Sequence, residues 1–374
     1  MFLALKEMAR AKVRFGMLIA AIAMLVFLIL FQQSLQNGLL TSFVGAIRNQ
    51  TAPVLVYTVD GQRVIQGSVV TPPLEQVVRD TDGVGRVGRI GQGTFTVDTS
   101  AGEGRYDATI LGFEAPELGA PQTLSKGRMA ERPQEAVASA ADASIGFDVG
   151  DVVVVQPGGL EIEIVGLADN VQLNAGPTMF VRYQTFVEAV GAANPDAGEP
   201  LPNVLAVSPA AGVTDAQLVD AINARSQDLD ALTKGDAADQ TPGVAQVRQS
   251  FQVIFLLYGL VIPCVTGLFF LIITFQKAGA LTLLRAIGAP AGRLVRALLI
   301  QVGLVLGAGF VVGVALYFPV SQRRLGGIPL QFETGAVIFW AILLTVLGVG
   351  SALLSARRVL AIDPIEATTG GGNR

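Results

Sequence analysis

The sequence predicts an α-helical membrane protein with a large mixed α+β domain outside the membrane. Three observations support this fold class. Four long stretches hold no charged residue, about two hundred mostly polar residues separate the first stretch from the other three, and 51% of all residues are hydrophobic while 15% are charged. We expect four transmembrane helices in a one-plus-three arrangement and an outer domain of two lobes.

The uncharged stretches have the length of transmembrane helices. Each covers about 17 to 25 residues, which an α-helix needs to cross roughly 30 Å of hydrocarbon. A helix in a soluble core would not stay uncharged on every face. We expect the four transmembrane helices at residues 15–37, 251–275, 297–320 and 334–356.

The first stretch has a competing interpretation as a secretory signal peptide, because basic residues precede it. However, the apolar run continues into the polar residues 32–36 without a small-residue cleavage site. We therefore expect it to stay in the protein.

The distribution of lysine and arginine predicts the orientation. Basic residues gather in segments 1–14, 276–296 and 357–374, whereas the loop at 321–333 holds only Arg323 and Arg324. The positive-inside rule places both termini and the 276–296 loop in the cytoplasm. Residues 38–250 then form the large extracytoplasmic domain, and residues 321–333 form a short loop on the same side.

Charge differs between the two parts of the chain. Residues 38–250 hold 13 Lys and Arg against 26 Asp and Glu, a net charge of −13, and the remainder carries +9. An acidic outer domain gives no support for nucleic-acid binding. A basic membrane portion is typical of a plasma-membrane protein whose inner face meets anionic lipid.

Composition excludes several kinds of active site. The chain has no histidine, which rules out a Ser-His-Asp triad, a Cys-His pair and histidine metal ligands. Its one cysteine, Cys264, falls inside the second predicted span, so it forms no intramolecular disulfide. None of the lysines follows a glycine, so there is no P-loop. We predict a non-catalytic chain without bound metal or cofactor, and ATP-driven work would use ATP and magnesium on a partner.

One glycine motif has two interpretations. Gly83, Gly85 and Gly88 satisfy G-x-G-x-x-G, and Glu103 follows at the distance a dinucleotide site requires. That fingerprint must follow a strand and open a helix, whereas this segment follows a predicted short helix and leads into a strand-like alternation. We favour a glycine-rich turn.

The outer domain alternates strand and helix patterns, with turns rich in glycine, proline and aspartate between them. Its acidic residues are scattered, which favours a solvated surface over a cation site. We expect strands at 53–59, 93–97, 106–113, 151–155, 160–167, 179–182 and 204–207, and helices at 72–80, 135–143, 183–190 and 215–223.

Small residues mark the third span. Gly303 and Gly307 form one G-x-x-x-G motif, and Gly309 and Gly313 form another. This spacing lets helices approach closely in lipid, within one chain or across a dimer. Pro263 in the second span permits a kink. The absence of charge from all four spans argues against a secondary transporter or an aqueous pore.

The N-terminal segment, residues 1–14, is predicted to form an amphipathic interfacial helix. Lys6, Arg10 and Arg14 recur every four residues and form one basic stripe, with apolar residues turned elsewhere.

Four segments resemble the FtsX/MacB-type ABC transporter permeases. The run KAGALTLLRAIGAPAGRLVRALLIQVGLVLGAGFVVG at 277–313 resembles the family's cytoplasmic helix and the glycine-rich span after it. SARRVLAIDPIEA at 355–367 is similar to the end of its last span, and residues 2–15 to its N-terminal helix. EAVASAADASIGFDVGDVVVV, with LEIEIVGLADN after it, resembles the MacB-like periplasmic core. Gly279 and Ala280 depart from the family pattern, which has an acidic residue there.

The resemblance implies that the 276–296 loop couples the permease to a separate P-loop ATPase. The docking helix would end at Gly288 and Pro290. The implied docking residues are Leu283, Leu284, Arg285, Ala286, Ile287, Gly288, Ala289 and Pro290.

The resemblance further implies a multi-pass protein of the bacterial inner membrane that acts by mechanotransmission. ATP hydrolysis on the partner would change the outer domain and drive export or extraction of a hydrophobic or lipid-linked substrate. Expected partners are the ATPase, a second permease copy or a paralogue, membrane lipid, and a periplasmic adaptor or lipoprotein. One alternative is an FtsX-like regulatory scaffold whose outer domain activates a cell-wall hydrolase. A membrane-anchored enzyme is disfavoured, because no nucleophile-base pair is evident.

Overall fold

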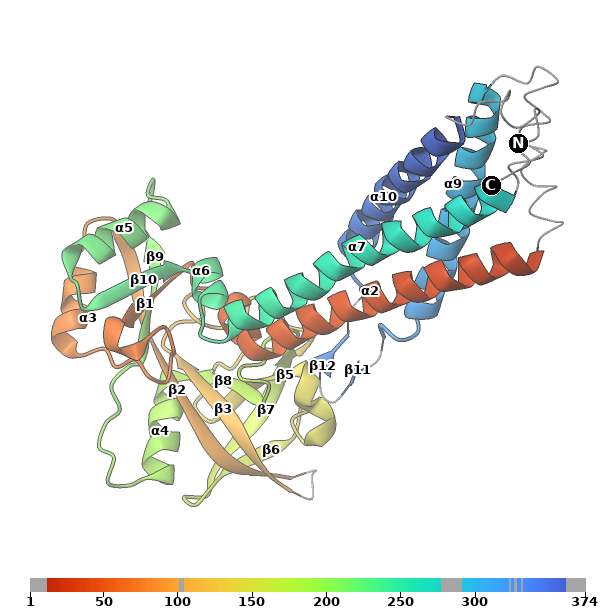
Figure 1. Cartoon of the computed structure of the whole chain (residues 1–374). Helices are drawn as coiled ribbons and strands as arrows, with labels where there is room; N and C mark the ends of the chain where they lie inside the picture. Colours follow the sequence, from red (N-terminus) through yellow and green to blue (C-terminus); the bar gives the residue numbers. More distant parts are fainter. Residues whose placement is uncertain are drawn as a thin grey trace, which may run out of the picture. The chain divides into compact units, whose positions relative to one another are not determined.

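The computed structural model describes residues 12–100, 104–276, 291–322, 324–325, 328–330 and 332–360. These residues form two compact units (Figure 1). The helical unit comprises the described residues of Met1–Gln36, Gln249–Arg324 and Leu330–Arg374, and the sheet unit comprises those of Asn37–Arg248 and Leu325–Pro329. The chain therefore enters the sheet unit after Gln36 and leaves it after Arg248.

Four helices are long and apolar enough to cross a membrane, judged by length and composition. They are α2 Lys12–Arg48, α7 Val244–Gln276, α9 Ala291–Tyr317 and α10 Thr334–Leu360. The 27 residues of α9 or α10 correspond to about 40 Å of helix, more than the hydrocarbon core of a bilayer. The predicted four apolar helices are thus confirmed, and their insertion into a membrane stays a prediction.

The helical unit has its core between α2, α9 and α10. Buried side chains of α2 recur every three or four residues from Phe15 to Leu30, so they lie along one side of the helix. They belong to one cluster with Leu306 of α9 and Leu344 of α10. Other side chains of α2, such as Met24, are exposed although they are apolar. A helix that is apolar on all sides is typical of a membrane span.

The sheet unit is built on one mixed sheet of ten strands in the order β10-β1-β9-β2-β3-β8-β5-β7-β4, with β6 pairing β2 and β7. The strands are β1 Val54–Thr58, β2 Val84–Thr99, β3 Arg105–Phe113, β4 Lys126–Gly127, β5 Glu135–Ser139, β6 Val152–Val155, β7 Leu160–Ala168, β8 Thr178–Arg182, β9 Val204–Pro209 and β10 Leu229–Thr233. The helices are α3 Pro72–Arg79, α4 Tyr183–Ala193, α5 Asp215–Arg225 and α6 Lys234–Asp239, and a further short pair is β11 Arg324–Leu325 with β12 Ile328–Pro329. The mixed α+β class is confirmed, whereas the division into two lobes is not.

Both faces of β1 are covered. Val56 lies in a core cluster with Leu218 of α5, while Leu55 lies in another with Ile47 of α2. Successive side chains of a strand point to opposite faces, so β1 separates these two cores. One face of β1 is therefore covered by the last turns of α2.

The predicted helix at 135–143 is wrong. Residues Glu135–Ser139 form β5, which pairs with β7 on one side and β8 on the other, and a 3-10 helix follows at Ala140–Ile145. The alanine-rich sequence favours a helix locally, but every residue of β5 is buried. Pairing and burial on both sides override that preference.

The glycine motif is also not simply a turn. Gly83 sits in a turn with φ +90, but Val84–Thr99 is a single strand of 16 residues. Gly85 marks a register shift against β9, where an added Cβ would lie 2.6 Å from the Pro209 carbonyl oxygen. Because the segment continues as a strand, it lacks the helix that a dinucleotide site needs.

Candidate functional site

Most of the residues that sequence reasoning assigned to function lie outside the described part of the chain. Lys6 and Arg10 of the basic stripe do so, whereas Arg14 is described and lies exposed near the start of α2. All eight assigned docking residues, 283–290, fall between α7 and α9 and are not described either. Their role in ATPase docking stays a prediction.

The described residues contain no group of three or more His, Cys, Asp or Glu that could hold a metal ion. One buried carboxyl, Glu135, has a structural partner. Arg128 donates to its two oxygens at 2.7 and 2.5 Å, and the backbone N–H of Arg132 donates at 3.1 Å. The Arg128 hydrogen bonds lower the pKa of Glu135 to about 2. These contacts fix the loop before β5.

The strongest candidate for a functional site is formed by the last turns of α2, which lie within the sheet unit. Val44 leaves helical geometry, with φ −131 and ψ 15. The carbonyls of Ser42 and Phe43 instead accept the N–H groups of Ala175 and Asn174, at 2.8 and 3.0 Å. The N–H of Ala46 donates to the Gln172 carbonyl at 3.0 Å. Helix ends must find partners for such groups, and here a loop of the sheet unit supplies them.

Gly45 allows this close approach. A Cβ at position 45 would overlap the carbonyl oxygen of Asn170. Asn49 donates from its side chain to the same oxygen at 2.6 Å. Asn170 and Asn174 adopt positive φ values of 59 and 53, a region that asparagine tolerates better than most residues.

Asp239 connects the end of α2 with the start of α7 inside the sheet unit. It lies at the end of α6, and its Oδ1 accepts hydrogen bonds from Arg48, the last residue of α2, and from Arg248 near the start of α7. The Arg248 bond is 2.8 Å long, and hydrogen bonding to Arg248 is the main cause of a lowered pKa at Asp239. We call Ser42–Arg48, residues 170–175, Asp239 and Arg248 the helix junction.

The four assigned glycines of α9 have two different surroundings. A Cβ at Gly309 would lie 2.6 Å from Ile22 Cγ2, and one at Gly313 would lie 2.7 Å from the carbonyl oxygen of Ala23. At Gly303 and Gly307 an added Cβ would meet no other described atom within 4 Å. Two glycines are therefore in close contact with α2, and the packing role assigned to all four stays a prediction.

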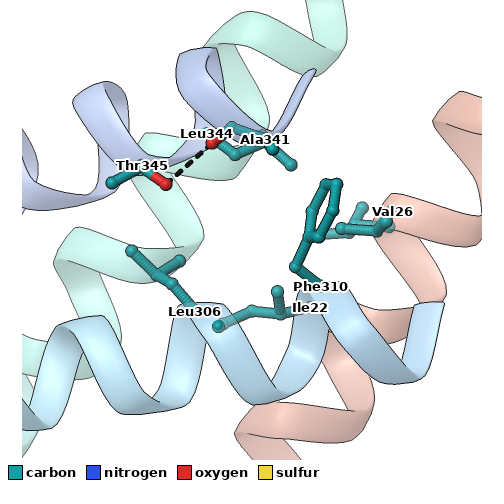
Figure 2. Close-up of a pocket in the computed structure, with 9 residues that line it drawn as sticks. Ile22, Val26, Leu306, Phe310, Ala341, Leu344 and Thr345 are labelled. Carbon is teal, nitrogen blue, oxygen red and sulfur yellow. Dashed lines mark hydrogen bonds between the residues drawn. The ribbon is translucent and has the colours of Figure 1, made fainter. Parts of the chain in front are cut away.

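A cavity of about 110 Å³ lies within the helical unit beside Gly307. Figure 2 shows Ile22 and Val26 of α2, Leu306 and Phe310 of α9, and Leu344 and Thr345 of α10 around it. The Thr345 hydroxyl donates to the Ala341 carbonyl at 2.7 Å, so the one polar side chain in the lining is already engaged.

Sequence reasoning identified neither the junction nor the cavity. The junction joins residues more than a hundred positions apart, and its signals, Gly45 and the asparagines of 170–174, resemble an ordinary loop composition. The cavity depends on how three helices meet.

The chain is similar to known proteins over part of its length. No protein-family model matches the chain. Over 107 residues it is 28% identical to HrtB of Staphylococcus epidermidis, and the matched segment covers 29% of this chain and 31% of that protein. Over 106 residues it is 30% identical to HrtB of Staphylococcus haemolyticus, covering 28% and 30%. Both are named as hemin transport system permease proteins, and the chain spans about a third of their length.

Solved structures give a weaker likeness. The periplasmic region of MacB from Actinobacillus actinomycetemcomitans matches at 13% identity and a TM-score of 0.36, covering 51% of this chain and 92% of that one. The extracellular domain of YknZ, a noncanonic ABC-type transporter from Gram-positive bacteria, matches at 14% identity and a TM-score of 0.33, covering 49% and 100%. These TM-scores are too low to establish a shared fold. The chain is similar to ABC transporter permeases of the FtsX/MacB type, as its sequence motifs predicted.

Proposed function

We propose that this chain is the permease subunit of an ABC transporter. A separate ATPase subunit binds ATP and magnesium, and its hydrolysis cycle changes the conformation of the extracytoplasmic domain. This mechanotransmission drives export or extraction of a hydrophobic or lipid-linked substrate. The protein lies in the bacterial inner membrane with both termini in the cytoplasm and acts with a second permease copy or a paralogue.

The observation that carries this proposal is the helix junction. Asp239 accepts hydrogen bonds from Arg48, the last residue of α2, and from Arg248, near the start of α7. Both helices are long and apolar enough to cross a membrane. The last turns of α2 and the start of α7 are thus both held by hydrogen bonds within the sheet unit.

The energy required is compatible with ATP-driven coupling. A shift of a two-state equilibrium from 1:99 to 99:1 takes about 5.5 kcal/mol. A helix end held by backbone hydrogen bonds resists displacement better than one held by exposed side-chain contacts alone.

ATPase docking is tested by charge changes in the 276–296 loop. The full chain is co-expressed with a candidate ABC ATPase from the same host and purified through a tag on the permease. We expect Leu284→Asp and Arg285→Glu each to abolish co-purification, because both residues belong to the proposed docking helix. Arg324→Glu, in the short loop expected on the opposite side of the membrane, is the matched control. Unchanged co-purification with both loop variants would overturn the docking assignment.

Orientation is tested by cysteine labelling. With Cys264→Ser as background, Asp196→Cys places a thiol on an exposed loop of the sheet unit, and Thr368→Cys places one in the tail. In spheroplasts, a membrane-impermeant maleimide should label position 196 at once and position 368 only after lysis. The reverse pattern would invert the topology.

A hydrolase-activating scaffold is the competing function. The purified full chain in detergent is tested against the cell-wall hydrolases of its host. Stimulation of hydrolase activity in the absence of any transported substrate would favour the scaffold over the transporter.

A further inference from the structure

The cavity in the helical unit is lined almost entirely by hydrocarbon. Of its lining side chains, only Thr345 carries a polar atom, and that hydroxyl already donates to the Ala341 carbonyl at 2.7 Å. A buried water needs two to four polar partners, which this lining does not offer. Water is therefore a poor occupant of the space.

The opening persists because its surroundings are tightly packed. At Gly307 an added Cβ would meet no other described atom within 4 Å. Two turns further along α9, a Cβ at Gly313 would lie 2.7 Å from the Ala23 carbonyl oxygen and from Val26 Cβ. On the other side, a Cβ at Gly348 of α10 would overlap Leu306. These contacts hold the three helices at fixed separations, so they cannot simply close on the cavity.

The cavity opens toward an apolar surface of the helical unit. Gly307 and Thr345 are exposed, whereas Leu306 and Leu344 at its inner side are buried. Exposed apolar side chains lie near the opening on both helices, with Val311 66% and Val346 62% exposed. In a membrane these side chains meet acyl chains, so a hydrocarbon chain can reach the cavity without passing a charged residue.

We propose that this cavity binds one acyl chain of a membrane phospholipid. A cavity of about 150 Å³ lined by similar side chains binds benzene. By that scale, the 110 Å³ here accepts a chain segment of about four carbons. A lipid-linked peptide is a less suitable occupant, because its peptide part would need polar partners that the described residues near the opening do not provide. The proposal depends on membrane insertion and not on the transport function.

The test fills the cavity with a larger side chain at Gly307. The full chain, Gly307→Leu and Gly303→Leu are purified in detergent, incubated with a dioleoyl phospholipid, and analysed by native mass spectrometry. Both substitutions add the same side chain to α9 where a Cβ meets no described neighbour, but position 303 does not line the cavity. We expect Gly307→Leu to retain one phospholipid fewer per chain than the unmodified protein, and Gly303→Leu to retain the same number.

Two further measurements make the result decisive. Gly307→Val serves as a smaller filling variant if the leucine variant unfolds. A diacylated peptide replaces the phospholipid in a parallel incubation. Equal phospholipid retention by all folded variants would overturn the proposal. Retention of the diacylated peptide alone, lost in the Gly307 variants, would overturn the assignment to a phospholipid.

Discussion

The contact between α9 and α2 at Gly313 predicts a sharp loss of stability on adding a single methyl group. In Gly313→Ala, the new Cβ would lie 2.7 Å from the Ala23 carbonyl oxygen and 2.7 Å from Val26 Cβ, whereas ordinary contacts begin at 3.4 Å. Because the Ala23 oxygen belongs to the α2 backbone, it cannot rotate away as a side chain does. The two helices must therefore separate locally by about 0.7 Å.

The magnitude follows from the matched glycine on the same helix. Gly303→Ala adds the same methyl group where no other described atom lies within 4 Å. Both variants gain the helix propensity of alanine, about 1 kcal/mol, so that gain cancels in the comparison. Overpacking costs about 1–3 kcal/mol. We expect Gly313→Ala to be less stable than Gly303→Ala by that amount.

The assay uses the protein's own fluorophore. Trp340 is the only tryptophan, is 4% exposed, and belongs to the same core cluster as Val26. Its fluorescence reports unfolding of the full chain in mixed micelles as the fraction of sodium dodecyl sulfate rises. Gly309→Ala should be destabilised as well, because its new Cβ would lie 2.6 Å from Ile22 Cγ2 and 2.8 Å from Ile22 Cβ, which the α2 backbone fixes. Equal stabilities of the Gly313 and Gly303 variants within 0.5 kcal/mol, roughly the scatter of neutral substitutions, would refute the contact.

Two further predictions concern the sheet unit. Gly45→Ala should destabilise it by about 1–3 kcal/mol, because the methyl group would overlap the Asn170 carbonyl. Gly191→Ala on α4 is the control, because its new Cβ meets no neighbour within 4 Å. Equal melting temperatures of the two variants in thermal unfolding would contradict the overlap. Glu135 has a depressed pKa of about 2 against an ordinary 4.5, so its contribution is complete above pH 4.5 and is lost as pH falls toward 2. The full shift corresponds to about 3 kcal/mol, which exposure of Arg128 reduces to roughly 1–2 kcal/mol. Glu135→Gln should flatten the pH dependence of unfolding in this window, and an unchanged slope would show that Glu135 does not cause it.

The four apolar helices were predictable because their signal is compositional. A helix in hydrocarbon must satisfy its own backbone and exclude charge along its whole length, so the charge gaps alone locate it. The prediction of strands was wrong where the local preference of the sequence differs from the conformation that tertiary contacts impose. Residues 136–138 read as helix, yet each is 0% exposed and paired on both sides. Their conformation is set by neighbours that no local pattern contains.

The junction was not predictable for a related reason. Val44 and Gly45 lie beyond the predicted span 15–37, yet α2 continues to Arg48, and only the loop at 170–175 explains why the helix departs from its geometry there. A glycine in a long apolar helix can also serve helix packing, as at Gly313, so the residue type alone does not distinguish the two roles. The identity of the contacting partner makes the difference.

The junction holds the end of α2 and the start of α7 by different means. At the end of α2, three backbone groups bond to the 170–175 loop, and Val44 is 2% exposed. Leaving one such buried group without its partner costs about 1–3 kcal/mol. At the start of α7, Arg248 and Asp239 are 37% and 42% exposed. An exposed ion pair contributes about 0.2–1 kcal/mol.

This difference predicts that, within the sheet unit, the end of α2 is held more firmly than the start of α7. Packing of Val244 in the core also restrains α7, but apolar contacts are non-directional and tolerate rotation of the helix. Amide hydrogens at 245–250 should therefore exchange faster than those at 45–49 in the full chain in detergent. Asp239→Asn should accelerate exchange at 245–250 and leave the α2 end almost unchanged, because the α2 backbone bonds do not involve Asp239. Equal exchange at the two helix ends, or acceleration of both in the variant, would mean that the ion pairs rather than the backbone bonds hold α2.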